Sequence, residues 1–173
     1  PTLGLWVCRP DGTGLSHYYK SYSRNPCMTS EALPIPGSHK IVCTAAAHHS
    51  YTAGSIISID PRLGQDGLGP LRRITPEVRF PESEDHSGSL AGSFASPYPL
   101  SENLFFVSYS PDQLGYSKPP RANGYAIYLV DTLGGRELIY RDPEMSCFSP
   151  IPIQPRPAPP VVPSVVQENC QEG

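Results

Sequence analysis

The chain has little charge and no long apolar run, and each of these shortages excludes a class of partner or location. Charged residues make up 17% of its 173 residues, with 13 basic and 16 acidic side chains and a formal net charge of −3. Such a balance does not provide the basic surface that is typical of nucleic-acid-binding domains. No apolar stretch approaches the ~20 residues that a membrane-spanning helix needs. We therefore expect neither a nucleic-acid partner nor a membrane span.

The cysteines lack the spacings of common metal and redox motifs. No Cys-x-x-Cys occurs, which excludes the zinc-ribbon and thioredoxin spacings and the attachment site of a c-type haem. We predict buried or free thiols, with one disulfide as an alternative, and we expect no cofactor bound by this chain alone. The five cysteines are Cys8, Cys27, Cys43, Cys147 and Cys170.

Helical patterns are scarce, whereas strand patterns are frequent. No stretch of a dozen residues has apolar side chains spaced i, i+3, i+4, i+7. Instead, 22 prolines and 15 glycines punctuate runs rich in aromatic and β-branched residues, which is typical of short strands joined by turns. The predicted strands span residues 3–9, 39–47, 54–61, 103–111, 124–132 and 136–142.

The strand pattern repeats along the chain. The segment "ALPIPGSHKIVCTAAA" at 32–47 aligns with "SPYPLSENLFFVSYSP" at 96–111, which lies 64 residues later (96 − 32). A third copy starts at 149–157 and is cut off. Self-similar antiparallel sheets indicate propeller blades. We predict an all-β partial β-propeller over residues 1–153, with about two blades, flanking strands, and the excess length of each repeat in loops at 64–100 and 112–123.

The two ends of the chain carry further expectations. Residues 154–173 are rich in proline and are predicted to form an extended tail or linker. The sequence begins directly with a strand-like stretch and has no start methionine or leader, so we expect a piece of a longer protein. Two blades cannot close a ring. The open sheet edges are therefore expected to pair with the remaining blades and domains, with a protein partner, or with a second copy.

Several segments in order resemble the propeller domain of hydrazine synthase alpha subunit-like proteins, over about residues 3–163. Among them are "PIPGSHKIVCTAAAHH", "GSIISIDPR" and "YAIYLVDTLGGRELIYRDPE". The stretch "LWVCRPDGTG" also resembles the more generic Tol-type propeller repeat. The resemblance implies an exported bacterial protein, periplasmic or extracellular. Chemistry in the characterised member depends on c-type haems at Cys-x-x-Cys-His sites, and this sequence has none.

Two adjacent histidines, His48 and His49, are candidates for facing a pocket or a partner. In an extended strand successive side chains point to opposite faces, so we expect that the two cannot share one ion. Zinc sites also need three or four protein ligands. We therefore predict no metal here, and a structural role for at least one of the two imidazoles.

A second group of candidates lies at residues 80–88 and near residue 147. The stretch "FPESEDHSG" combines Glu82, Glu84, Asp85 and His86, which could hold a hard cation or tune a proton-transfer group. A solvated acidic loop is the preferred interpretation. Cys147 could be a ligand or a reactive thiolate, although its apolar neighbour Phe148 favours a buried thiol.

No catalytic residue is assigned from the sequence. We expect a structural or interaction scaffold within a larger exported protein. One alternative is the propeller portion of a multihaem or metal oxidoreductase. A glycan- or peptide-binding module is the other, since a propeller by itself does not define an activity.

Overall fold

The computed structural model describes residues 3–49, 51–84, 89–115 and 121–155, together with residues 158 and 161. Within these residues the chain is all-β, as predicted, with one 3₁₀ helix (Pro61–Leu63) and no α-helix. No described helix is long and apolar enough to cross a membrane. The strands are β1 (Leu5–Val7), β2 (Ser16–Tyr19), β3 (Met28–Pro34), β4 (Ile41–Ala46), β5 (Gly54–Ile59), β6 (Leu71–Arg73), β7 (Ser89–Pro99), β8 (Leu104–Gly115), β9 (Ala126–Asp131) and β10 (Arg136–Tyr140).

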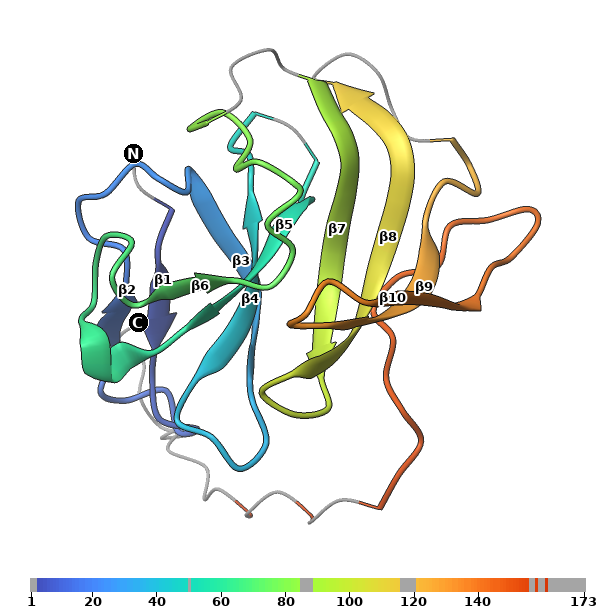
Figure 1. Cartoon of the computed structure of the whole chain (residues 1–173). Helices are drawn as coiled ribbons and strands as arrows, with labels where there is room; N and C mark the ends of the chain where they lie inside the picture. Colours follow the sequence, from blue (N-terminus) through green and yellow to red (C-terminus); the bar gives the residue numbers. More distant parts are fainter. Residues whose placement is uncertain are drawn as a thin grey trace, which may run out of the picture.

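Eight of these strands form two antiparallel meanders (Figure 1). In the first meander β3 pairs with β4, β4 with β5, and β5 with β6. The second meander repeats this order with β7, β8, β9 and β10. A single bridge between Gly54 and Phe94 joins them. Backbone pairing between the two meanders is thus limited to this bridge, and each meander is a four-stranded unit.

The aligned repeat segments occupy corresponding places in the two meanders, although equivalent residues of the first strands lie 65 residues apart (99 − 34) and not 64. Pro34 pairs with Ile41 across the first turn of one meander, and Pro99 pairs with Phe105 across that of the other. The first strand of each also has a register shift just before this turn, at residues 30–33 and 95–98. A β-bulge tolerates proline, because the extra residue leaves the ladder of hydrogen bonds. Pro97 lies within such an irregularity, whereas Pro34 and Pro99 are the last residues of β3 and β7.

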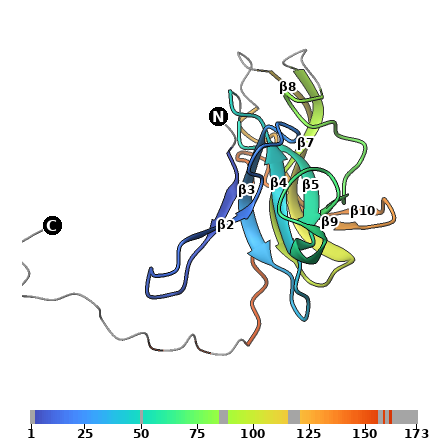
Figure 2. The same cartoon turned by 90° about the vertical axis from the view of Figure 1, so that its left-hand side faces the viewer.

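The central strands β4 and β5 are buried on both faces. One face packs against the second meander in a cluster that includes Val42, Ile56, Phe94 and Phe105. The opposite face packs, through residues such as Ile57, against the hairpin formed by β1 and β2. In Figure 2 this hairpin (dark blue) lies on the side of β3 that faces away from β9 and β10. Burial on both faces explains why "IVCTAA" and "GSIISI" are nearly continuous apolar runs.

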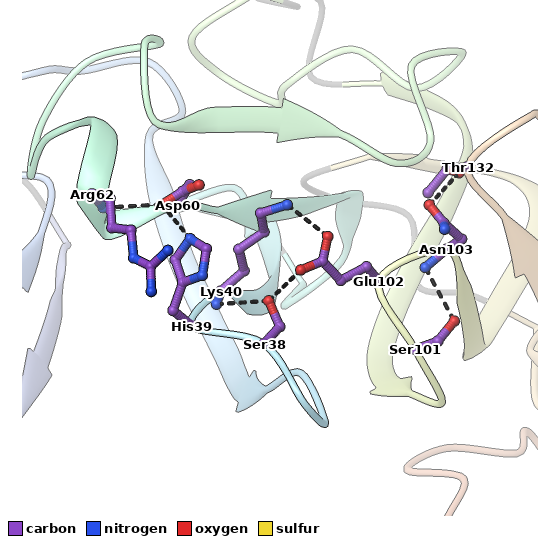
Figure 3. Close-up of polar contacts among 9 residues, drawn as sticks. All are labelled: Ser38, His39, Lys40, Asp60, Arg62, Ser101, Glu102, Asn103 and Thr132. Atoms are coloured by element: carbon purple, nitrogen blue, oxygen red, sulfur yellow. Dashed lines mark hydrogen bonds and ion pairs between the residues drawn. The ribbon is translucent and has the colours of Figure 1, made fainter.

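The first turns of the two meanders are linked by side chains (Figure 3). The Lys40 ammonium donates to a Glu102 carboxylate oxygen at 2.6 Å, and the Ser38 hydroxyl donates to the other oxygen of the same carboxylate. Lys40 and Glu102 are both partly exposed. This contact fixes the relative position of the turns, and exposed ion pairs add only about 0–1 kcal/mol to stability.

The expectations about the architecture have different outcomes. The described residues form two antiparallel meanders, and their assignment to blades of a partial propeller stays a prediction. Residues 149–153 form no strand, although the repeat predicts the start of one there. The regions 64–100 and 112–123, which were predicted to hold the excess length mostly in loops, also contain β6, β7 and the end of β8. Most of the predicted tail, 154–173, lies outside the described residues.

Candidate functional site

The adjacent histidines lie at a bend that follows β4, and this changes the prediction made for them. β4 ends at Ala46, and His48 and His49 are no longer in extended pairing. The rule that neighbouring strand residues point to opposite faces therefore does not apply to them. Their Nδ1 atoms lie 3.3 Å apart, and the two rings meet edge to face with centroids separated by 4.1 Å.

Glu82 holds this bend from a turn that is distant in sequence. One carboxylate oxygen accepts the His48 backbone N–H at 2.8 Å, and the other accepts the His49 N–H at 2.7 Å. The His49 Nδ1 atom lies 2.9 Å from the same Glu82 oxygen. Glu82 itself has φ 63°, a left-handed conformation that costs a residue with a side chain about 1–2 kcal/mol. The turn at residues 81–84 thus positions one carboxylate against two imidazoles.

The Glu82 carboxylate stays ionised well into the acid range. Burial raises its pKa, but hydrogen bonds from Cys27, from the two backbone N–H groups and from His49 outweigh burial and lower the pKa to about 2. The Cys27 Sγ donates to Glu82 Oε2 at 3.0 Å. Burial and this carboxylate together raise the pKa of Cys27. At neutral pH the site therefore holds a carboxylate and a protonated thiol.

His48, His49 and Glu82 line a hollow of about 480 Å³, and cationic side chains also lie on its wall. Lys20 is 1% exposed and has φ 77°, and its ammonium donates to the Cys27 carbonyl oxygen at 2.8 Å. Burial lowers the pKa of Lys20. Arg24 lies on the same wall. The hollow thus combines imidazoles, one carboxylate and two cationic side chains.

The preferred interpretation of residues 80–88 as a solvated acidic loop is wrong for Glu82 and Glu84. Their side chains are 14% and 25% exposed. The Glu84 carboxylate accepts hydrogen bonds from Arg73, from the Asn25 amide at 3.0 Å and from the Phe80 backbone N–H at 3.1 Å, which is a structural role. Asp85 and His86 lie outside the described residues.

The thiols are free, as predicted, for the four cysteines that the structure describes, which are Cys8, Cys27, Cys43 and Cys147. The expectation of a buried Cys147 is wrong, because this residue is only half-buried. Its backbone N–H donates to the Tyr125 carbonyl oxygen at 3.0 Å, which places it against the second meander. Cys147 does not belong to the group formed by His48, His49 and Glu82.

A second hollow brings together three segments with the same sequence pattern. They are "EALP" at 31–34, "SPYP" at 96–99 and "SPIP" at 149–152. The first three residues of each segment line one hollow of about 350 Å³. The first residue of each has a left-handed backbone, with φ 55° at Glu31, 50° at Ser96 and 52° at Ser149. These repeat-equivalent residues therefore lie around a common space.

Equivalent contacts also join the second and third of these segments to the meander before each of them. Ala53 and Tyr125 precede β5 and β9, and Ala95 and Phe148 precede the left-handed Ser96 and Ser149. Ala53 and Ala95 belong to one buried cluster with Tyr125. The Tyr125 and Phe148 rings lie 4.6 Å apart. The segment at 147–152 thus contacts the second meander at the position that is equivalent to the one at which β7 contacts the first meander.

Sequence reasoning missed several residues of these two sites. Cys27, Lys20 and Glu31 carry no motif, and their roles depend on contacts across 55, 7 and 65 residues of sequence. The shared "x-P" endings of the three segments were a usable signal for the second hollow. For the first hollow, only the adjacent histidines were visible in the sequence.

Comparison of the sequence with protein-family models found no matching family, and searches among curated proteins and solved structures found no match either. The resemblance to hydrazine synthase alpha subunit-like proteins therefore stays a prediction. The structure itself defines the class as an all-β protein built from stacked antiparallel meanders.

Proposed function

We propose that the chain is a section of a β-propeller and serves as an interaction scaffold. The observation that carries the proposal is the meeting of Glu31, Ser96 and Ser149 around one hollow. In a propeller the sheets are arranged radially about a central channel. Two first-strand residues, Glu31 in β3 and Ser96 in β7, and the equivalent Ser149 share one space, which fits this arrangement.

The stacking of the sheets supports the same proposal. The hairpin packs on the first meander, the first meander packs on the second, and the segment at 147–152 packs on the second. Each layer covers an apolar face of the one before it. The final segment has no such cover among the described residues, and Phe148, Ile151 and Ile153 are 50%, 67% and 106% exposed. We assign this face to a further antiparallel sheet, supplied in the purified chain by a second copy.

Sedimentation velocity of the full chain, from low to high micromolar concentration, tests this assignment. We expect concentration-dependent association that the double substitution Ile151→Ser/Ile153→Ser abolishes. Leu133→Ser is the matched control, since Leu133 is 94% exposed but lies in the turn between β9 and β10. A chain that stays monomeric throughout, or an association that the control removes equally, would contradict the scaffold proposal.

The proposal also includes a cellular location and leaves two alternative activities open. A periplasmic or extracellular location rests on the family resemblance. A multihaem oxidoreductase of the c type would need Cys-x-x-Cys-His sites outside this sequence, which has none. That alternative, like the glycan- or peptide-binding module, stays a prediction.

A further inference from the structure

The bend after β4 brings together three side chains of two types, imidazole and carboxylate, that metal ions use as ligands in proteins. His48, His49 and Glu82 each offer one ligand atom, and these atoms all lie within 4.8 Å of one another. Imidazole nitrogen and carboxylate oxygen together suit Zn²⁺ among the first-row ions. We propose that His48 Nδ1, His49 Nδ1 and Glu82 Oε1 bind a divalent first-row metal ion, with Zn²⁺ as the ion of choice.

The spacing of the two imidazoles fits one shared ion. Two nitrogens that each lie about 2.05 Å from Zn²⁺ at a tetrahedral angle are about 3.3 Å apart. His48 Nδ1 and His49 Nδ1 are 3.3 Å apart. The Glu82 oxygen lies 2.9 Å from His49 Nδ1, so binding requires only a small outward shift of the carboxylate. The three atoms are thus arranged close to three corners of one coordination sphere.

The carboxylate is held in place before any ion arrives. The backbone N–H groups of both histidines and the Cys27 thiol donate hydrogen bonds to the Glu82 carboxylate. These donors are different atoms from the three proposed ligand atoms. Such outer contacts fix ligand orientation in metal sites.

The surroundings leave a fourth position open and limit the affinity. The ligands lie on the wall of a hollow, and the His49 side chain is 73% exposed, so water or a small anion completes the coordination. Three protein ligands with one open position are usual in catalytic zinc sites. Lys20 and Arg24 on the same wall repel a cation. We therefore expect a dissociation constant of about 10 μM, weaker than that of a closed structural zinc site.

A hydrogen-bonded histidine–carboxylate pair elsewhere in the chain provides the matched control. His39 Nε2 lies 2.8 Å from Asp60 Oδ1 (Figure 3), and His39 is also partly exposed. No second histidine contributes to that pair among the described residues. If a single histidine beside a carboxylate were enough to bind zinc, His39 would matter as much as His49.

Isothermal titration calorimetry of Zn²⁺ into the metal-free, reduced full chain tests the site, with Co²⁺ absorption as a second measurement of coordination geometry. We expect one ion per chain and at least about tenfold weaker binding for His48→Gln and for His49→Gln. His39→Gln should bind Zn²⁺ as the native chain does. Circular dichroism of the metal-free variants checks that each remains folded.

Two outcomes would overturn the proposal. Either the native chain binds no stoichiometric Zn²⁺ at concentrations up to about 1 mM, or the affinities of His48→Gln and His49→Gln equal that of the native chain. The second outcome would show that any zinc binds elsewhere on the chain. Neither result depends on whether the chain self-associates, so the metal site and the scaffold proposal can fail separately.

Discussion

The Glu31 carboxylate joins the two meanders, and its removal should measurably weaken the fold. Its oxygens accept hydrogen bonds from the Thr44 hydroxyl at 2.7 Å, the Ser96 backbone N–H at 2.7 Å and the Ser96 hydroxyl at 2.9 Å. Thr44 is 0% exposed and Ser96 is 8% exposed. Truncation of Glu31 therefore leaves buried donors without their acceptor.

The size of the effect follows from these contacts. Hydrogen bonds to a charged group contribute about 1.5–3 kcal/mol each, and an unsatisfied buried donor costs about 1–3 kcal/mol. Because Glu31 is itself exposed, water replaces part of the loss. We expect Glu31→Ala to lower the free energy of unfolding by about 2–4 kcal/mol.

Two further substitutions of Glu31 separate the effect of the lost hydrogen bonds from the effect of backbone strain. Glu31→Gln retains an acceptor for Thr44 and for the Ser96 N–H, so the loss should be about 1 kcal/mol. Glu31→Gly removes the same contacts as alanine but accommodates φ 55° without strain, and it should be about 1 kcal/mol more stable than Glu31→Ala.

Urea denaturation followed by far-ultraviolet circular dichroism measures all three variants under identical conditions. The order expected is native, then Gln, then Gly, then Ala. A Glu31→Ala variant within about 0.5 kcal/mol of the native chain, or a glycine variant less stable than alanine, would refute the reasoning about this contact.

Two other predictions concern acid stability and close packing. Hydrogen bonds lower the pKa of Glu82 and of Glu84 from 4.5 to about 2 despite burial; stability is therefore present above pH 4.5 and lost toward pH 2, by about 2 kcal/mol for each group after allowance for solvent. Urea denaturation at several pH values should show this loss, and the double variant Glu82→Gln/Glu84→Gln should lose less over the same range; an equal loss would contradict the assignment. Gly54→Ala should destabilise the chain by about 3 kcal/mol or more because the new Cβ collides with the Ala45 carbonyl oxygen. At Gly69 an added Cβ meets nothing within 4 Å, so Gly69→Ala should leave the melting temperature nearly unchanged; equal effects of the two alanines would show that the Gly54 contact does not matter.

The sequence by itself determined the all-β class, most of the strands and the repeat. Apolar runs such as "IVCTAA" and "GSIISI" are punctuated by proline and glycine, and this local pattern is enough to predict strands because it depends only on neighbouring residues. The 64-residue repeat aligned the second strands of the two meanders, since Ile41 and Phe105 lie 64 residues apart (105 − 41), but it missed the one-residue offset of the first strands, where Pro34 corresponds to Pro99.

Only the tertiary structure decided how these elements meet. The bend at His48 and His49 is held by Glu82, 33–34 residues later in the sequence, so the strand-based prediction of opposite faces could not anticipate it. Glu82 and Glu84 were predicted to be solvated because their neighbours are polar, yet long-range partners bury both. The hollow at Glu31, Ser96 and Ser149 also depends on packing between sheets. Contacts between residues distant in sequence leave no local periodicity, and for that physical reason the sites became visible only in the folded chain.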